Sequence, residues 1–358
     1  MKIAPLSLLI FLCLFLTPSD LLAKPKHEFK IASLAPEGSV WVDSFKEFAA
    51  EVTEKTGGEV GFCRLETAGF IATEVISEVG FRIYPGGIMG DDRAMYRKMR
   101  VGQLHGGGFT MTGIAEVVDD FRVMAIPFLF HSYEEMDKVS AELQPLFRKR
   151  FSEKGLHLVA MTEVGFVYTF SNKPRLTIAD LQQAKTWGPT DDPLTSAFLK
   201  NLNISPIALT IPDVLASLQT GLIDTAFNSL YGSIILQWFT KAPYVTDAPY
   251  GYAYGCFILS GKAMAKLSDA QLGVIEEAAA KHFGELIQKT RQSNEESRSV
   301  LISQGVKFVA TTPEVLATLE KYRDQTIDQV KGKAFSEEIY QTLNQTLEAL
   351  RSTKDGDS

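Results

Sequence analysis

The chain has 358 residues, of which 45% are apolar and 22% are charged. This length allows more than one hydrophobic core, and the composition is typical of a globular protein and excludes extended disorder. The formal net charge of −7 at pH 7 excludes the basic surface that binding to nucleic acid or to an anionic membrane requires.

Residues 1–23 have the pattern of a secretory signal peptide. Lys2 provides a short basic start, an apolar run follows from Leu6 to Leu16, and a short polar stretch leads to Ala23. The run is too short to cross a bilayer, which favours a signal peptide cleaved after Ala23 over an uncleaved anchor. No later stretch of the sequence reaches the roughly 18 apolar residues of a membrane span. We therefore expect the mature protein to be exported.

Strand-like and helix-like patterns alternate along the rest of the chain, which favours an α/β fold with mostly parallel sheets. The polar residues 351–358 are expected to form a disordered tail. In chain order we expect a strand at 29–35, a helix at 40–58, a strand and glycine-rich turn at 82–90, a helix at 91–104, a long strand at 156–171, and mostly helix from 268 to 351.

A short direct repeat marks a candidate insertion. Residues 59–62 read Glu-Val-Gly-Phe, and the same four letters recur at 78–81. We interpret residues 63–81 as an insertion bounded by this duplication; the alternatives are a chance tetrapeptide beside an ordinary hairpin, or an error in the deduced sequence. Because insertions are best tolerated at exposed turns, we expect a hairpin or loop there.

The chain lacks the residue patterns of common catalytic sites. It has no nucleophile elbow, no phosphate-binding P-loop and no zinc-binding His-Glu-x-x-His helix. Its five histidines are scattered, so no pair has the spacing of metal ligands. The carboxylate pairs at 91–92 and 119–120 are interpreted as solvated helix caps, and the glycines at 106–108 as a tight turn. We predict a protein that is not an enzyme and needs no metal or cofactor.

Aromatic residues gather in the central third of the chain. Most are expected to be core, but Tyr and Trp carry a polar group on an apolar ring and are common where an apolar ligand meets hydrogen bonds. This composition favours binding over catalysis. The residues are Phe166, Tyr168, Phe170, Trp187, Phe198, Phe227, Tyr231, Trp238, Phe239, Tyr244, Tyr250, Tyr252 and Tyr254.

Two motifs resemble the ligand-binding half of the solute receptors of tripartite ATP-independent periplasmic (TRAP) transporters, the DctP-like family. That family has a strand with the pattern DL-x-G-x-K-x-R and, further along, a helix end with the pattern AL-x-x-G-x-x-D-x-x-x-N. The first is matched here by Asp180, Leu181 and Lys185, and the second by Leu218, Gly221, Asp224 and Asn228. Without the insertion, the resemblance extends over nearly all of the mature chain, including KIASLAPEGSVW (30–41), IYPGGIMG (83–90) and IPFLF (126–130).

The resemblance implies a periplasmic receptor that encloses a small molecule between two α/β lobes, with crossing strands as the hinge and a long C-terminal helical region. By that likeness lobe I comprises 24–164 plus 253–292, and lobe II comprises 165–252 plus 293–350. The implied partners are the integral membrane permease subunits of a TRAP transporter. A ligand-sensing or scaffold protein of the same fold is the alternative from another functional class.

The chain departs from the family pattern at Trp187, where the family has the arginine that binds a substrate carboxylate. Arginine pairs with a carboxylate through two parallel hydrogen bonds, whereas tryptophan can remove roughly 150–250 Å² from water. At about 25 cal/mol per Å², that is a gross gain of about 4–6 kcal/mol for an apolar ligand. The substitution therefore predicts a neutral or largely hydrophobic ligand.

The alternative to an apolar ligand is an organic acid bound by a substitute cation. Lys185 is the first candidate, because strand alternation would place it on the same face as Trp187. Arg175, Arg82 and Arg97 are further candidates.

The predicted ligand-binding residues come from both lobes. We expect Trp187, with Phe166 or Tyr168, to stack on the ligand and Asn228 to form a hydrogen bond with it. The lobe I residues follow strand ends that should face the cleft. The full predicted set is Trp187, Asn228, Phe166, Tyr168, Trp41, Phe109, Thr110, Tyr231 and Lys185.

Overall fold

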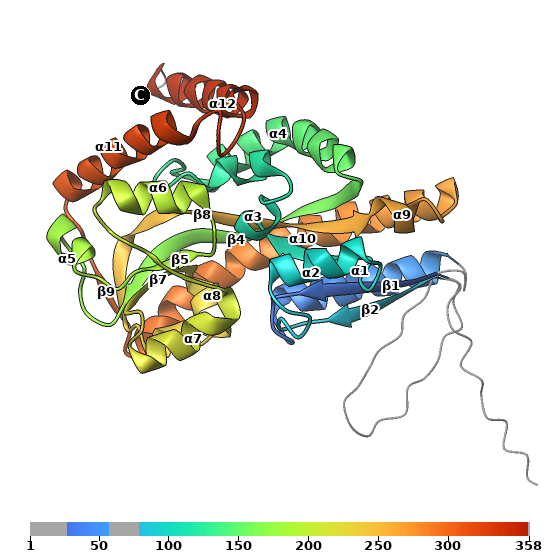
Figure 1. Ribbon diagram of the computed structural model, residues 1–358, viewed down its shortest axis with the longest axis horizontal. Helices are drawn as coiled ribbons and strands as arrows, with labels where there is room; N and C mark the ends of the chain where they lie inside the picture. The colour runs from blue at the N-terminus through green and yellow to red at the C-terminus, as the bar shows by residue number, and fades with distance from the viewer. Residues whose placement is uncertain (1–26, 57–78, 357–358) are drawn as a thin grey trace, which may run out of the picture.

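The computed structural model describes residues 27–56 and 79–356 (Figure 1). The predicted signal peptide, residues 1–23, lies outside the described residues. Within the described part of the chain, no helix combines the length and the apolarity that a membrane span needs.

A seven-stranded mixed sheet forms the centre of the molecule, with the order β2-β1-β3-β8-β4-β7 and with β9 paired to β8; β5 and β6 form a separate small sheet. β1 is parallel to β2 and β3, but β8 is antiparallel to both β3 and β4, so the expectation of mostly parallel sheets is wrong for the long strands. The strands are β1 (His27–Ser33), β2 (Val79–Tyr84), β3 (Gly106–Thr110), β4 (Leu156–Ser171), β5 (Trp187–Pro189), β6 (Ile207–Leu209), β7 (Thr225–Ser229), β8 (Tyr244–Ser260) and β9 (Lys307–Val309).

The long strands β4 and β8 join the two halves of the molecule. They pair with each other along nearly their whole lengths, from Leu156 with Ser260 to Ser171 with Tyr244. One end of this ribbon continues into β3, β1 and β2, and the other end carries β7 and β9 (Figure 1). The architecture therefore agrees with a two-lobed α/β protein whose lobes share two crossing strands.

Helices cover both faces of the sheet, and the longest one spans both halves. Helix α10 has 35 residues, begins with a capping box between Ser268 and Gln271, and contacts α1 in one half and α8 in the other (Figure 1). The helices are α1 (Val40–Lys55), α2 (Asp92–Arg100), α3 (Met111–Ile114), η1 (Asp119–Ala125), α4 (Tyr133–Glu153), α5 (Ile178–Gln182), α6 (Pro193–Asn201), α7 (Ile211–Thr220), α8 (Leu230–Ile235), η2 (Trp238–Thr240), α9 (Gly261–Met264), α10 (Asp269–Ser303), α11 (Pro313–Val330) and α12 (Glu337–Gly356).

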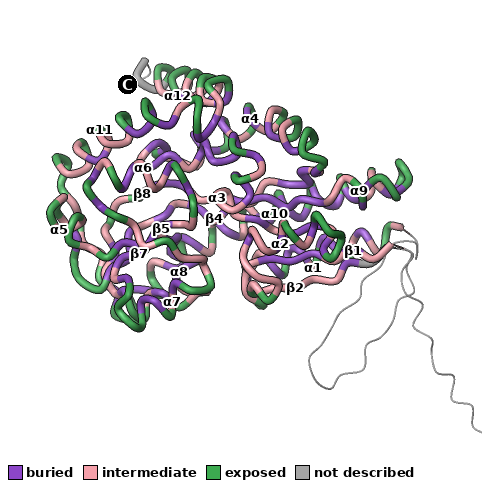
Figure 2. The backbone as a smooth tube through the Cα atoms, viewed as in Figure 1, coloured by how far each residue is buried: buried purple, intermediate pink, exposed green. Residues whose placement is uncertain are grey.

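Each half has its own apolar core. In the first, Phe48 of α1 packs against Phe257 of β8 and Phe283 of α10. In the second, Phe170 of β4 and Trp238 belong to a separate cluster. Figure 2 shows the buried positions gathered along the central strands and on the inner sides of the surrounding helices. This rigid framework positions the strand ends between the halves.

The glycines at 106–108 form most of β3 instead of the predicted turn. A Cβ atom at Gly106 would lie 2.3 Å from the carbonyl oxygen of Ile258, and one at Gly107 would lie 2.4 Å from that of Ala32. A side chain at either position would push β3 away from β8 or β1, so these glycines serve the close approach of strands.

The second copy of the repeated tetrapeptide lies in β2. Val79, Gly80 and Phe81 pair with residues 27–29 of β1, whereas residues 57–78, which include the first copy, lie outside the described residues. Because the copies are identical, removing 59–77 or 63–81 leaves the same sequence. The pairing favours the first boundary, since it keeps β2 whole.

The predicted disorder of residues 351–358 is wrong up to Gly356, where α12 ends. Arg351 pairs with Glu135 at 2.8 Å and donates to the carbonyl of Leu129 at 2.7 Å. These contacts hold the end of the helix against α4; residues 357–358 lie outside the described residues.

Candidate functional site

A cavity of about 210 Å³ lies between the two halves of the molecule. It is lined by the ends of β1 and β3, the first turn of α1, the middle of β4 and β8, and parts of β5, α7, β7 and α8. No Arg, Lys, His, Asp or Glu among the described residues lines it. The cavity therefore offers apolar surface and a small number of neutral polar groups.

Trp187 contributes an aromatic wall to this cavity. It is the first residue of β5 and is only 6% exposed, and its ring meets that of Trp238 edge-on with a centroid distance of 5.5 Å. Its indole nitrogen donates to the carbonyl of Leu209 at 3.0 Å. Because this donor is already used, the Trp187 ring can offer a ligand only apolar contact.

Trp41 lines the opposite side of the cavity, and Tyr231 supports it. The Trp41 indole nitrogen donates to the carbonyl of Glu163 at 2.7 Å. The Tyr231 ring lies 5.1 Å from that of Trp41, and its hydroxyl accepts from the backbone N–H of Val40 at 3.1 Å. Tyr231 does not itself line the cavity. It connects α8 to the start of α1.

Asn228 brings an amide to the cavity from β7. Its Oδ1 accepts from the N–H of Ser229 at 2.9 Å, which leaves its NH₂ group as a donor. Gly232 makes room for this side chain, because a Cβ atom there would lie 2.3 Å from Asn228 Oδ1. Asn228 thus offers the cavity a hydrogen-bond donor in a fixed position.

Phe109 and Thr110 line the cavity at the end of β3, but the polar groups of Thr110 are engaged elsewhere. Its N–H and its hydroxyl donate to the two carboxyl oxygens of Asp92, at 3.1 and 2.7 Å, and its hydroxyl caps α3. Burial raises the pKa of Asp92 to about 7, despite these hydrogen bonds. The prediction of a solvated carboxylate at position 92 is therefore wrong, although Asp91 does cap α2.

The structure does not bring Phe166 or Tyr168 to the cavity. Thr162, Val164 and Val167 of β4 line it, so the inward face changes between positions 164 and 167. The cause is an irregularity in the β4–β8 pairing at Gly165, whose φ is +102°. Phe166 packs instead on Tyr133 and Tyr252, and Tyr168 packs against the second core.

Lys185 also lies outside the cavity. It is exposed, and its ammonium group donates to the carbonyl of Gly221 at 3.0 Å. The strand alternation that predicted a shared face with Trp187 does not extend to Lys185, because β5 begins only at Trp187. Two other candidate cations are elsewhere: Arg82 pairs with Glu28, and Arg97 is exposed on α2.

Three tyrosines of β8 line the cavity without having been singled out as site residues. Tyr250, Tyr252 and Tyr254 alternate with small residues along the strand, and this spacing of two is a pattern from which a shared face could have been predicted. Burial raises the pKa of each hydroxyl, so all three are neutral. Trp238, Phe227 and Val167 complete the apolar lining.

The sequence and the fold match a family of known receptors. The family model of bacterial extracellular solute-binding proteins, family 7 (DctP), matches residues 67–333. A solute-binding protein of Roseobacter denitrificans is 25% identical over 284 residues, which cover 78% of this chain and 80% of that protein. The C4-dicarboxylate-binding periplasmic protein DctP of Rhodobacter capsulatus is 22% identical over 265 residues, which cover 73% of this chain and 79% of that protein.

Solved structures show the same architecture. The sugar acid binding protein DctPAm of Advenella mimigardefordensis, in complex with galactonate, matches with a TM-score of 0.80 at 19% identity, covering 91% of this chain and 99% of that chain. The likeness at this identity concerns the fold.

Proposed function

Because the chain belongs to family 7 of the bacterial extracellular solute-binding proteins, the DctP family of TRAP receptors, we propose that it closes around a neutral or largely apolar solute. The members to which it is similar are solute-binding receptors and not enzymes, and the family implies a periplasmic location and delivery of a small molecule to a membrane permease. We take lobe I, residues 24–164 plus 253–292, and lobe II, residues 165–252 plus 293–350, as the two bodies that close around the solute.

The uncharged lining of the cavity is the observation that carries the proposal. The named ligands of the relatives, C4-dicarboxylates and galactonate, are acids. A carboxylate enclosed here would meet no cation among the described lining residues. Its desolvation would cost on the order of several kcal/mol. Trp187 and Trp41 supply apolar rings whose polar atoms are already bonded, and Asn228 supplies one orienting donor.

An acidic ligand is the second candidate, and Arg175 favours it. Arg175 is 2% exposed and pairs with Asp224 at 2.9 Å, and its Nε has no hydrogen-bond partner among the described residues. It lines a second cavity of about 40 Å³ that shares Phe227 and Tyr250 with the first. These two rings stack with centroids 4.3 Å apart where the two cavities meet.

The deciding experiment is native mass spectrometry of the exported protein, followed by denaturing extraction and identification of the released solute. A neutral or apolar molecule supports the first proposal, and calorimetric titration with that molecule should then give saturable binding. A carboxylate contradicts it. In that case Arg175→Gln and Lys185→Gln form a matched pair: loss of binding only in Arg175→Gln would place the acid in the second cavity.

A further inference from the structure

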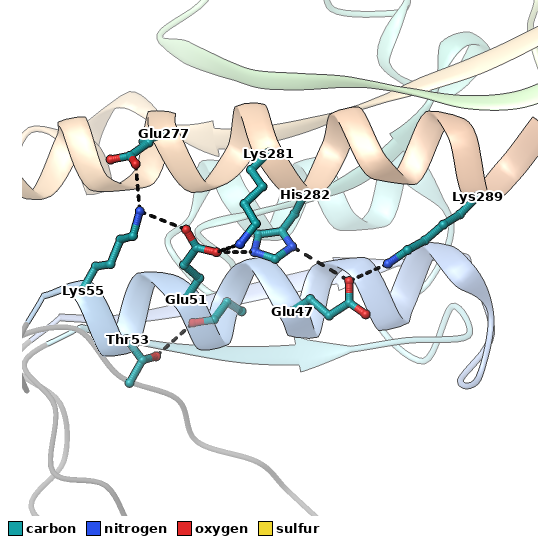
Figure 3. A network of polar contacts seen from close by, with 9 residues as sticks. Glu47, Glu51, Thr53, Lys55, Glu277, Lys281, His282 and Lys289 are labelled. Carbon is teal, nitrogen blue, oxygen red and sulfur yellow. Dashed lines mark hydrogen bonds and ion pairs between the residues drawn. The ribbon is translucent and has the colours of Figure 1, made fainter.

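Helices α1 and α10 form a charged seam on the outer side of the first half, away from the ligand cavity. On the buried side of this seam, Phe48 of α1 and Phe283 of α10 pack with ring centroids 5.5 Å apart. At its solvent edge, Glu47 and Glu51 of α1 face His282 and the two lysines of α10, Lys281 and Lys289 (Figure 3). The seam is therefore apolar on its buried side and strongly ionic at its solvent edge.

His282 is the buried group of this seam, with 7% of its surface exposed. Its Nε2 lies 2.8 Å from Oε2 of Glu51. Lys281 and Lys55 also contact Glu51, so this carboxylate is held beside the ring and accepts a hydrogen bond from the Nε2–H group. The other ring nitrogen, Nδ1, is buried and has no hydrogen-bond partner among the described residues.

Two further carboxylates approach this ring. Glu47 of α1 has Oε2 3.8 Å from His282 Nδ1, too far for a hydrogen bond. Glu285 follows one turn after His282 on α10, and one ligand atom from each of the three residues lies within 4.8 Å of the other two. Two carboxylates thus lie close to an imidazole ring whose Nδ1 has no partner among the described residues.

We propose that Glu47, His282 and Glu285 bind a divalent transition metal ion, with Zn²⁺ as the representative. One imidazole and two carboxylates suit zinc, and three protein ligands leave a position for water. Imidazole ligation disfavours Ca²⁺ and Mg²⁺, which prefer oxygen. Glu51 accepts a hydrogen bond from the other ring nitrogen, Nε2, and so acts as a positioning residue that orients His282. The spacing of histidines did not reveal this group, because it contains a single histidine and its third member lies on another helix.

The lysines around the seam oppose the ion only weakly. Lys289 contacts Glu47 at 2.7 Å, and both side chains are largely exposed, so an ion displaces Lys289 from Glu47 at little cost. Lys281 and Lys55 remain with Glu51, and Lys55 also contacts Glu277. A bound ion would join α1, which leads out of the ligand cavity, to the helix that spans both halves.

The test uses the mature protein with its purification tag removed, stripped with a chelator and titrated with ZnCl₂ by calorimetry. We expect one ion per chain and a higher melting temperature in Zn²⁺. His282→Gln should abolish binding, Glu47→Gln and Glu285→Gln should weaken it at least about tenfold, and Glu51→Gln should weaken it about 10–100-fold. With Co²⁺ as the probe, visible absorption should appear in the wild type and be lost in His282→Gln.

His157→Gln is the matched control, because His157 lies 3.9 Å from Glu276 but belongs to no such group among the described residues. It should leave Zn²⁺ binding unchanged. The absence of saturable Zn²⁺ binding by the wild type, or equal binding in His282→Gln, would overturn the proposal. Should His282→Gln fail to fold, the largely exposed Glu47 and Glu285 still provide variants that test it.

Discussion

The indole nitrogen of Trp187 is bonded to Leu209, so this residue presents only ring surface to the cavity. In Trp187→Arg a guanidinium would enter a wall without a charged partner among the described residues. We expect the variant to lose about 3–5 kcal/mol of stability without an acid, by the cost of an unpaired buried charge, and to gain binding to a carboxylate such as galactonate. Thermal unfolding with and without galactonate measures both effects.

Trp187→Phe is the control for that substitution, because it keeps an uncharged apolar ring, although a smaller one, and removes the hydrogen bond to Leu209. It should bind the extracted apolar solute more weakly, by about 1 kcal/mol, and should gain no affinity for galactonate. If Trp187→Arg binds the apolar solute as tightly as the wild type does, Trp187 is not part of the ligand site.

Asp92 makes stability depend on pH. Burial raises its pKa in the folded protein to about 7 from a reference value of 3.8, so the folded state holds this proton more tightly than the unfolded state does. The contribution of Asp92 is fully present below pH 3.8 and is lost as the pH rises through about 7. Asn cannot ionise, so the free energy of unfolding of Asp92→Asn should increase relative to that of the wild type as the pH rises from 5 to 8. Urea denaturation at the two values checks this, and a pH-independent difference would contradict it.

Strand β4 shows what the sequence could predict at the level of an element. Its run of β-branched and aromatic residues predicts 156–171, and the strand occupies Leu156–Ser171. Which side chains of β4 point into the cavity was not predictable from the sequence. That choice depends on the irregularity at Gly165, which arises from pairing with β8, a strand distant in sequence. For the same reason Thr162, Val164 and Val167 reach the cavity in place of Phe166 and Tyr168.

Gly165→Ala should disturb this element. The φ of Gly165 is +102°, and a Cβ atom there would lie 2.6 Å from Asn294 Nδ2, which itself bonds the carbonyl of Val164 at 2.9 Å. We expect a loss of about 1–3 kcal/mol of stability, measured by urea denaturation. Gly155→Ala is the matched control: φ is +70° but no atom lies within 4 Å, so only the backbone strain of about 1 kcal/mol should appear.

On the scale of the whole molecule, the resemblance to TRAP receptors predicted the two halves, the crossing strands and the cavity between them. Five of the residues for which it predicts a ligand-binding role line this cavity, and they lie in strands or at the start of a helix: Trp187, Asn228, Trp41, Phe109 and Thr110. It could not predict Tyr231 as a link between the halves, because that contact depends on how closely α8 approaches α1. Nor could it predict the position of Lys185, which depends on where the short strand β5 begins.

Two side-chain contacts join the halves of the molecule near the cavity. The Tyr231 hydroxyl accepts from the Val40 N–H at 3.1 Å, and Arg93 of α2 pairs with Asp191 at 2.5 Å. The Arg93 pair is partly exposed and therefore contributes little, whereas the tyrosine contact is half-buried beside Trp41. A receptor that binds its ligand only when closed has an apparent affinity that scales with the closed fraction.

Tyr231→Phe should therefore weaken ligand binding without touching the cavity wall. It keeps the ring against Trp41 and removes only the hydroxyl acceptor, a loss of about 1 kcal/mol, so the dissociation constant should rise about fivefold. The radius of gyration of the ligand-free protein, measured by X-ray scattering, should increase. Tyr340→Phe on α12, away from the cavity, should change neither quantity. An unchanged affinity together with an unchanged radius in Tyr231→Phe would show that closure does not depend on this link.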